Sequence, residues 1–212
     1  MESRRAIVIG AGIVGLATAR ALAEKGYRVT VFERNENATG ASIRNFGMIW
    51  LIGQPDGQLY ERGLRSKSIW KQCCTEAGLW FEETGSLHLA YNQKEWQVMN
   101  EVAGILQHRN VKVLSKEDTL SKSEAVNPKG LIGSLWSPHE TIIESRVAIE
   151  KLPVYLSEKY AVQFHFNTTI SSVEYPFVKS NEKSWQADQI FVCSGADFET
   201  LYPDVYAANH FI

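Results

Sequence analysis

Residues 6–16 read AIVIGAGIVGL, and this stretch decides the fold of the amino-terminal part of the chain. Residues 5–9 are apolar and β-branched after the first position, which is typical of a strand buried on both faces. Three glycines then follow in G-x-G-x-x-G spacing, and residues 16–25 are rich in alanine and leucine, which favours a helix. The pattern predicts a strand, a tight turn and a helix whose amino terminus suits a diphosphate.

Each of the three glycines is required for a different reason. Gly10 permits the turn out of the strand, Gly12 lets a pyrophosphate approach the backbone, and Gly15 lets helix and strand pack closely. Residues 27–32 predict a second strand, and Glu33 at its end can accept hydrogen bonds from the ribose of an adenine nucleotide. This order within about thirty residues indicates a dinucleotide-binding βαβ unit. The alternative is a βαβ unit whose glycines serve packing only.

A second competing interpretation of the same stretch is a secretory signal peptide. Arg4 and Arg5 precede an uncharged run, and residues 17–19 (ATA) imitate a cleavage site. However, the run contains three glycines, leads into a strand that ends in an acid, and is shorter than the roughly eighteen residues that span a bilayer. We therefore expect neither export nor membrane insertion.

The composition is that of an ordinary globular protein. The 212 residues are 44% hydrophobic and carry a net charge of −2, so one large or two small domains and no nucleic-acid partner are expected. Cys73, Cys74 and Cys193 are odd in number and form no C-x-x-C pair, which indicates a reducing cytoplasm without disulfides or structural zinc. The histidines lack metal-ligand spacing and are read as surface or packing residues: His88, His108, His139, His165 and His210.

A polar loop follows the second strand. Residues 34–42 are too polar for a core element and lead into IRNFGMIW at residues 43–50. Such a loop suits the ribityl chain and ring of a flavin, since Ser42 and Asn45 can supply hydrogen bonds and Gly47 lets the backbone come close. The alternative is an ordinary surface loop.

The rest of the chain alternates helices and strands. Before residue 140 we expect helices at 58–77, 92–109 (capped by Asn92) and 115–124 (capped by Ser115), with strands at 85–90, 111–114 and 131–136. Beyond it we expect a helix at 144–160 with Ser145 as a plausible N-cap, a strand at 162–166, a hairpin of 168–174 with 184–187, and a strand at 189–193. That last strand runs into Ser194-Gly195-Ala196, where small residues leave room for a dinucleotide.

Three stretches together resemble the flavin-dependent amine oxidases of the D-amino acid oxidase, glycine oxidase and sarcosine oxidase superfamily. They are residues 7–34 (IVIGAGIVGLATARALAEKGYRVTVFER), residues 40–48 (GASIRNFGM), and NTTISSVE (167–174) with IFVCSGA (190–196). The resemblance implies an α/β fold: a discontinuous, incomplete Rossmann-like FAD-binding domain at 1–84 and 141–212, and part of a substrate-facing α+β domain at 85–140.

The resemblance also implies which residues contact FAD. For the adenosine diphosphate part they are the pyrophosphate contacts Gly10, Gly12 and Gly15, the ribose acceptor Glu33, the basic Arg34 beside the adenosine, and Ile170, whose backbone pairs with adenine. For the remainder they are Ser42, Asn45, Gly47 and Met48 in the flavin loop and Gly195, which packs against the cofactor. No catalytic residue is assigned, and Arg44 and His139 are read as structural.

The function implied by the resemblance is oxidation of a small amine or amino acid to an imine, with hydride transfer to the flavin. LWSPHE (135–140) with ESRVA (144–148) resembles a bacterial subgroup suspected of handling aminophosphonates. Members of the superfamily are considerably longer, so a C-terminal truncation, a missing half or a partner chain is expected. Two alternatives stay open: an NAD(P)-dependent dehydrogenase, and a non-catalytic, truncated nucleotide-binding remnant or subunit.

Overall fold

The computed structural model describes residues 3–197 and 199–208. Its internal contacts divide the chain into two compact units. Unit 1 contains residues 1–46, 73–79 and 144–212, and unit 2 contains residues 47–72 and 80–143. The assignment of 1–84 and 141–212 to cofactor binding and of 85–140 to the substrate remains a prediction about roles.

Unit 1 is built on a four-stranded parallel sheet. Its order is β13 (Gln189–Val192), β1 (Arg5–Ile9), β2 (Arg28–Phe32) and β9 (Gln163–His165). Each neighbouring pair runs parallel. Residues 6–9 of β1 are buried, as expected for a strand covered on both faces. The α/β fold class is therefore confirmed.

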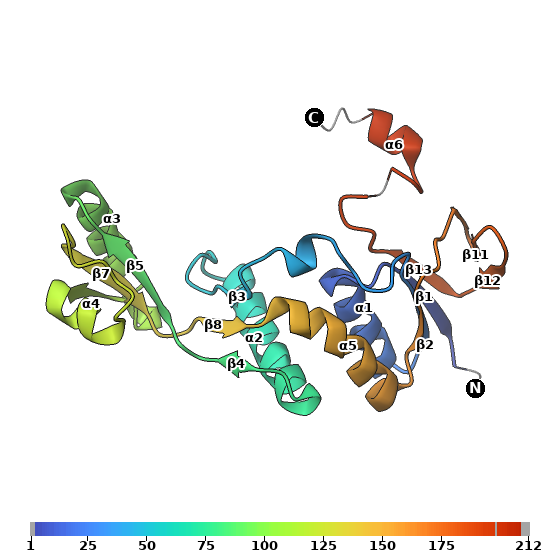
Figure 1. The fold of residues 1–212 in the computed structure, drawn as a ribbon, viewed down its shortest axis with the longest axis horizontal. Helices are drawn as coiled ribbons and strands as arrows, with labels where there is room; N and C mark the ends of the chain where they lie inside the picture. The colour runs from blue at the N-terminus through green and yellow to red at the C-terminus, as the bar shows by residue number, and fades with distance from the viewer. Residues whose placement is uncertain (1–2, 198, 209–212) are drawn as a thin grey trace. The chain divides into compact units, whose positions relative to one another are not determined.

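Two helices of unit 1 pack against each other, α1 (Ile13–Glu24) and α5 (Ser145–Tyr160) (Figure 1). The first begins three residues before the predicted start, because Gly12 is extended and its carbonyl accepts the first helical bond from Leu16 at 2.9 Å. The cap predicted for α5 is wrong. Glu144 caps this helix by accepting from Arg146 N, while Ser145 is its first helical residue and donates to Asn45 O at 3.4 Å.

The predicted hairpin at 168–187 is a three-stranded antiparallel meander instead. It consists of β10 (Ser172–Glu174), β11 (Phe177–Lys179) and β12 (Ser184–Gln186). The extra strand lies in the stretch read as a connection. It forms because Val178 is fully buried in a cluster with Ile7, Ile9 and Phe32, which a solvated loop cannot provide. A short helix, α6 (Pro203–Ala208), was also not predicted.

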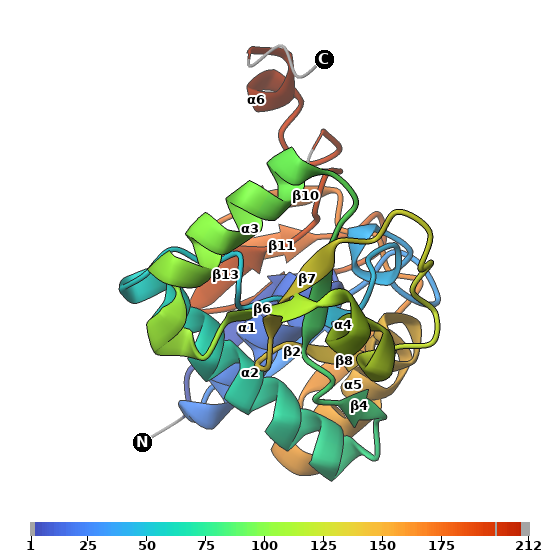
Figure 2. The same cartoon turned by 90° about the vertical axis from the view of Figure 1, so that its left-hand side faces the viewer.

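Unit 2 contains an antiparallel sheet of order β5 (Ser86–Ala90), β7 (Gly133–Ser137) and β6 (Lys112–Ser115). Two helices contact it, α3 (Gln93–Ile105) and α4 (Lys116–Lys122) (Figure 2). Both predicted caps are confirmed, because Asn92 accepts from Glu95 N and Ser115 accepts from Asp118 N, each at 3.0 Å. The helix predicted to reach residue 109 ends at 105, and a 3₁₀ turn, η2 (Gln107–Arg109), follows.

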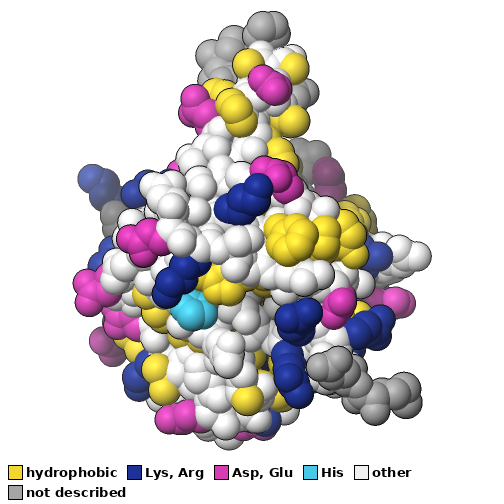
Figure 3. All heavy atoms as spheres, turned by 90° about the vertical axis from the view of Figure 1, so that its right-hand side faces the viewer, with side chains coloured by type: hydrophobic (Ala, Val, Ile, Leu, Met, Phe, Trp, Pro, Cys, Tyr) yellow, Lys and Arg dark blue, Asp and Glu magenta, His cyan; other side chains and the backbone are white. Residues whose placement is uncertain are grey.

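A second small sheet joins β3 (Met48–Ile49), β8 (Thr141–Ile143) and β4 (Phe81–Glu82) in unit 2, and none of these short strands was predicted. The long helix α2 (Gln58–Ala77) has the predicted bounds, and the division into units falls within it. No helix in the described part of the chain is long and apolar enough to cross a membrane. Basic and acidic side chains are interspersed over the face drawn in Figure 3.

Candidate cofactor-binding site

A cavity of about 1070 Å³ lies within unit 1, at the carboxyl ends of three parallel strands. Its wall combines residues after β1, β2 and β13 with the first turn of α1, the loop at 38–45 and the segment 168–170. Ligands of parallel α/β sheets bind at this end of the strands. Of the residues predicted to contact FAD, the following line it: Gly10, Gly12, Glu33, Arg34, Ser42, Asn45, Ile170 and Gly195.

The backbone is crowded at the glycine turn. Gly10 has φ +104°, and a Cβ built on it would overlap the carbonyl oxygen of Cys193. A Cβ on Gly15 would likewise overlap the carbonyl of Gly10, so Gly15 brings helix α1 against the turn instead of lining the cavity. Both positions therefore require glycine for close packing.

The first turn of α1 offers hydrogen-bond donors to the cavity. Its N-cap, Gly12, has no side chain to cap the helix, and the N–H groups of Gly12 and Val14 bond to no described residue. The N–H of Ile13 donates to Ser42 Oγ at 2.9 Å. Ser42 thus caps α1 from another segment and holds the loop at the helix amino terminus.

Glu33 is buried at the end of β2, with 8% of its surface exposed. Its carboxylate accepts from Ala11 N at 2.9 Å and from Asn35 N at 3.1 Å, so it braces the glycine turn as well as its own loop. Each of these bonds uses a different oxygen, and a carboxylate oxygen has two lone pairs. The side chain therefore retains acceptor capacity for a ribose hydroxyl.

Arg34 forms an ion pair with Asp197, which lies beyond β13, and Thr200 donates to the same carboxylate at 3.3 Å. This contact joins the chain after β2 to the chain after β13 at the cavity wall. The sequence does not indicate this ion pair, because Arg34 and Asp197 are 163 positions apart.

The loop predicted to contact flavin is divided between the units. Asn45 uses its amide to donate to Ser42 O at 2.6 Å, which stiffens the loop around the 3₁₀ turn η1 (Ala41–Ile43). Gly47 and Met48 belong to unit 2 and do not line the cavity. At Gly47 (φ +67°) the close backbone approach is to Ile143, whose N–H donates to Gly47 O at 2.9 Å.

Several cavity residues were missed by the sequence analysis, among them Thr168 and Thr169. They are held because Thr168 N donates to Glu33 O at 2.9 Å, and Asn167 N donates to Asn35 O at 3.1 Å. The sequence could have indicated them by their position after the strand β9, because ligands of parallel sheets bind at the carboxyl ends of the strands.

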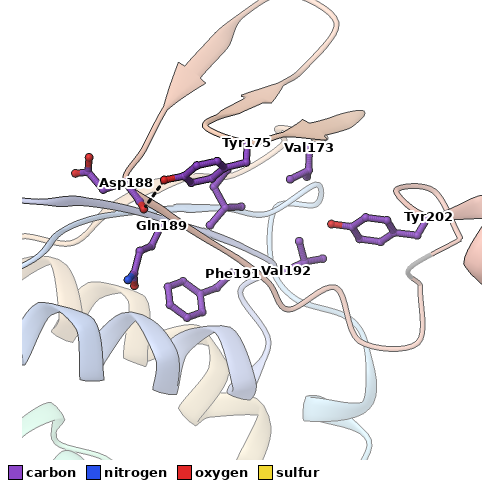
Figure 4. Close-up of a pocket in the computed structure, with 8 residues that line it drawn as sticks. Val173, Tyr175, Asp188, Gln189, Phe191, Val192 and Tyr202 are labelled. Carbon is purple, nitrogen blue, oxygen red and sulfur yellow. Dashed lines mark hydrogen bonds between the residues drawn. The ribbon is translucent and has the colours of Figure 1, made fainter.

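A smaller pocket of about 530 Å³ runs along β13 in the same unit (Figure 4). Tyr175 lies over the start of that strand and donates its hydroxyl to Asp188 O at 3.3 Å. Val173, Phe191 and Tyr202 are also in the wall. None of the residues predicted to contact FAD lines this pocket.

Burial disfavours the reactive thiolate form of all three cysteines. Burial raises the pKa of Cys74 to about 11 and also raises the pKa of Cys73 and of Cys193. Among the described residues, His, Cys, Asp and Glu make no cluster that could hold a metal ion. His210 lies outside the described residues.

Comparison with known proteins gives a family match over residues 5–210, to "FAD dependent oxidoreductase". A D-amino acid dehydrogenase of Neisseria meningitidis is 25% identical, over 95% of this chain and 63% of that protein. Glycine oxidase from Geobacillus kaustophilus superposes with a TM-score of 0.82 at 19% identity, over 96% of this chain and 59% of the other. L-proline dehydrogenase from P. horikoshii gives 0.82 at 22% identity, over 95% and 55%. The chain thus spans less than two thirds of the length of these proteins.

Proposed function

The chain belongs to the FAD-dependent oxidoreductase family, and on that premise we propose that it binds FAD in the cavity of unit 1 and oxidises a small amine or amino acid to an imine. One observation carries the proposal: the glycine turn, Glu33, Ser42, Ile170 and Gly195, far apart in sequence, line one cavity. The D-amino acid dehydrogenase relative supports the substrate class.

The residues present fit the diphosphate of this cofactor. The turn at Gly10 has no space for a side chain, and the N–H groups of Gly12 and Val14 have no described partner. Together with the positive end of the α1 dipole, these free donors favour an anion at this point. The volume of about 1070 Å³ also reaches the upper range of small-molecule sites.

The residues around the cavity would bind and orient FAD. When bound, FAD supplies the hydride-accepting chemistry. Glu33 would hold the ribose, the N–H groups of α1 would hold the diphosphate, and Asn45 with Ser42 would fix the loop beside the flavin. We assign no acid or base to this chain, because orientation by the protein and redox chemistry by the cofactor suffice for amine oxidation.

The finer proposal is that the substrate is an aminophosphonate, supported only by the resemblance of residues 135–148. A second polypeptide, or further chain, would complete the substrate site, since the relatives carry 37–45% of their length outside the match.

The direct test is thermal unfolding of the purified chain with FAD, FMN or NAD. A ligand at about 100 times its Kd adds about 2.7 kcal/mol to the free energy of unfolding. For a protein of this size that corresponds to a Tm increase of about 5–10 °C. We expect the increase with FAD and none with NAD. Stabilisation by NAD alone would favour the nicotinamide-dependent alternative, and no response to either would favour a non-catalytic subunit.

A further inference from the structure

We propose that Arg44 is a binding residue for the diphosphate of the cofactor. This inference rests on the proposed function and adds a charged contact to it. The sequence predicts a structural role for Arg44, but the structure gives its side chain no polar contact with a described residue. Its side chain makes no hydrogen bond or ion pair with any described residue, and it is exposed at the cavity wall.

The charges around the cavity single out this residue. Besides Arg44, the charged side chains of the described wall are Glu33, Arg34 and Asp197. Glu33 accepts from two backbone N–H groups, and Arg34 is paired with Asp197. Within the part of the wall that the structure describes, Arg44 is thus the cation without a counter-ion. A bound diphosphate would supply one.

The loop geometry brings Arg44 near the predicted diphosphate position. Ser42, two residues earlier, is hydrogen-bonded to the first residue of α1. Arg44 itself ends the turn η1, with its N–H donating to Ala41 O at 3.1 Å. The backbone at Arg44 is therefore fixed next to the helix terminus, while its long side chain is free to reach an anion.

The chemistry of the guanidinium matches this ligand. Its planar N–H groups bind phosphate oxygens in pairs. The free N–H groups of Gly12 and Val14 would contact the same diphosphate from the helix side. The diphosphate would then be held by backbone donors and one side-chain cation.

The test compares wild type with Arg44→Gln, using isothermal titration with FAD and with riboflavin, which lacks phosphate. We expect Arg44→Gln to weaken FAD binding about five- to tenfold, because a charge-assisted contact is lost. Riboflavin binding is expected to stay within twofold. Raising NaCl from about 50 to about 500 mM should weaken FAD binding more in wild type than in the variant, because salt screens the attraction between Arg44 and the diphosphate, which only the wild type has.

Arg28→Gln is the matched control, since Arg28 is exposed at the opposite end of β2 and its loss removes the same charge. It should bind FAD as wild type does, and Arg44→Lys should recover part of the affinity. Unchanged FAD affinity in Arg44→Gln, or an equal loss for riboflavin, overturns the inference while leaving the proposed function standing. A wild-type chain that takes up no FAD overturns both.

Discussion

At the scale of single residues, the glycine turn depends on side chains far away in the sequence. Gly12 cannot cap α1 by itself, and Ser42 supplies the missing acceptor for Ile13. Glu33 in turn accepts from Ala11, inside the turn. The glycine turn is therefore held in place by Ser42 and Glu33, two residues that lie outside the glycine motif.

Gly10→Ala tests whether the turn tolerates a side chain. The new Cβ would overlap the Cys193 carbonyl at a backbone φ of +104°, so we expect a loss of about 2–4 kcal/mol in the free energy of unfolding and loss of FAD binding. Urea denaturation measures the first effect. The control is Gly104→Ala, in open space on α3, which should stabilise by about 1 kcal/mol. Equal effects of the two substitutions would contradict the role given to Gly10.

Ser42→Ala tests the cap supplied from the loop. Loss of one hydrogen bond to a part-buried N–H should lower the free energy of unfolding by about 1 kcal/mol and weaken FAD binding, because the loop loses its anchor. Ser66→Ala, at an exposed position of α2, is the control and should change stability by less than about 0.5 kcal/mol. A variant Ser42→Ala as stable as this control would argue against the cap.

At the scale of elements, local signals located helices well where a cap or a periodic apolar face was present. The bounds of α2 and the caps Asn92 and Ser115 follow the prediction. Local signals failed where a residue gained its role from a distant contact. Ser145 suits an N-cap by type, but Glu144 takes that position and the Ser145 hydroxyl bonds to Asn45 O.

Helix α2 is joined to the residue after β4 by an ion-pair network that makes stability depend on pH. Lys71, and then Lys67, lower the pKa of Glu83 to about 2, from an ordinary value of 4.5. A depressed carboxyl pKa stabilises the fold above pH 4.5, and this contribution disappears as the pH falls towards 2. The Glu83 side chain is 40% exposed, so solvent screening keeps the contribution below about 1 kcal/mol.

Glu83→Gln should therefore lower the free energy of unfolding by up to about 1 kcal/mol at pH 7 and leave it unchanged near pH 2. Urea denaturation at both pH values measures the difference. Glu82→Gln, at the adjacent exposed acid, removes the same charge outside the two ion pairs and serves as the control, with an expected change of less than about 0.5 kcal/mol at pH 7. A constant difference for Glu83→Gln across the pH range would rule out the ion pairs as its cause.

At the scale of the whole molecule, the residues predicted to contact FAD belong to unit 1, except for two residues of the flavin loop. The glycine turn, Glu33 and the segments near residues 170 and 195 line a cavity inside unit 1. Gly47 and Met48, by contrast, lie in unit 2. Unit 1 therefore contains every described residue of the cavity wall.

Hydrogen–deuterium exchange in the presence of FAD tests whether the cofactor binds in the cavity of unit 1. We expect slower exchange in peptides that cover residues 9–14, 32–45 and 168–170, because these segments line the cavity. Peptides from α3 and β7, in unit 2, should exchange at unchanged rates. NAD at the same concentration is the control and should protect none of them. Protection confined to unit 2 would place the cofactor elsewhere.

The sequence by itself determined the βαβ unit and the family, and eight of the residues that it predicted to contact FAD line the cavity. Glycines, β-branched runs and a terminal acid act through local backbone geometry, which is encoded within about thirty residues. Only the tertiary structure decided that Arg34 pairs with Asp197 and that Ser42 accepts a hydrogen bond from Ile13. It also decided that a strand, β11, forms where Val178 is buried. These outcomes depend on contacts between distant segments, such as Arg34 and Asp197, which lie 163 positions apart, and neither periodicity nor spacing carries information about such pairs.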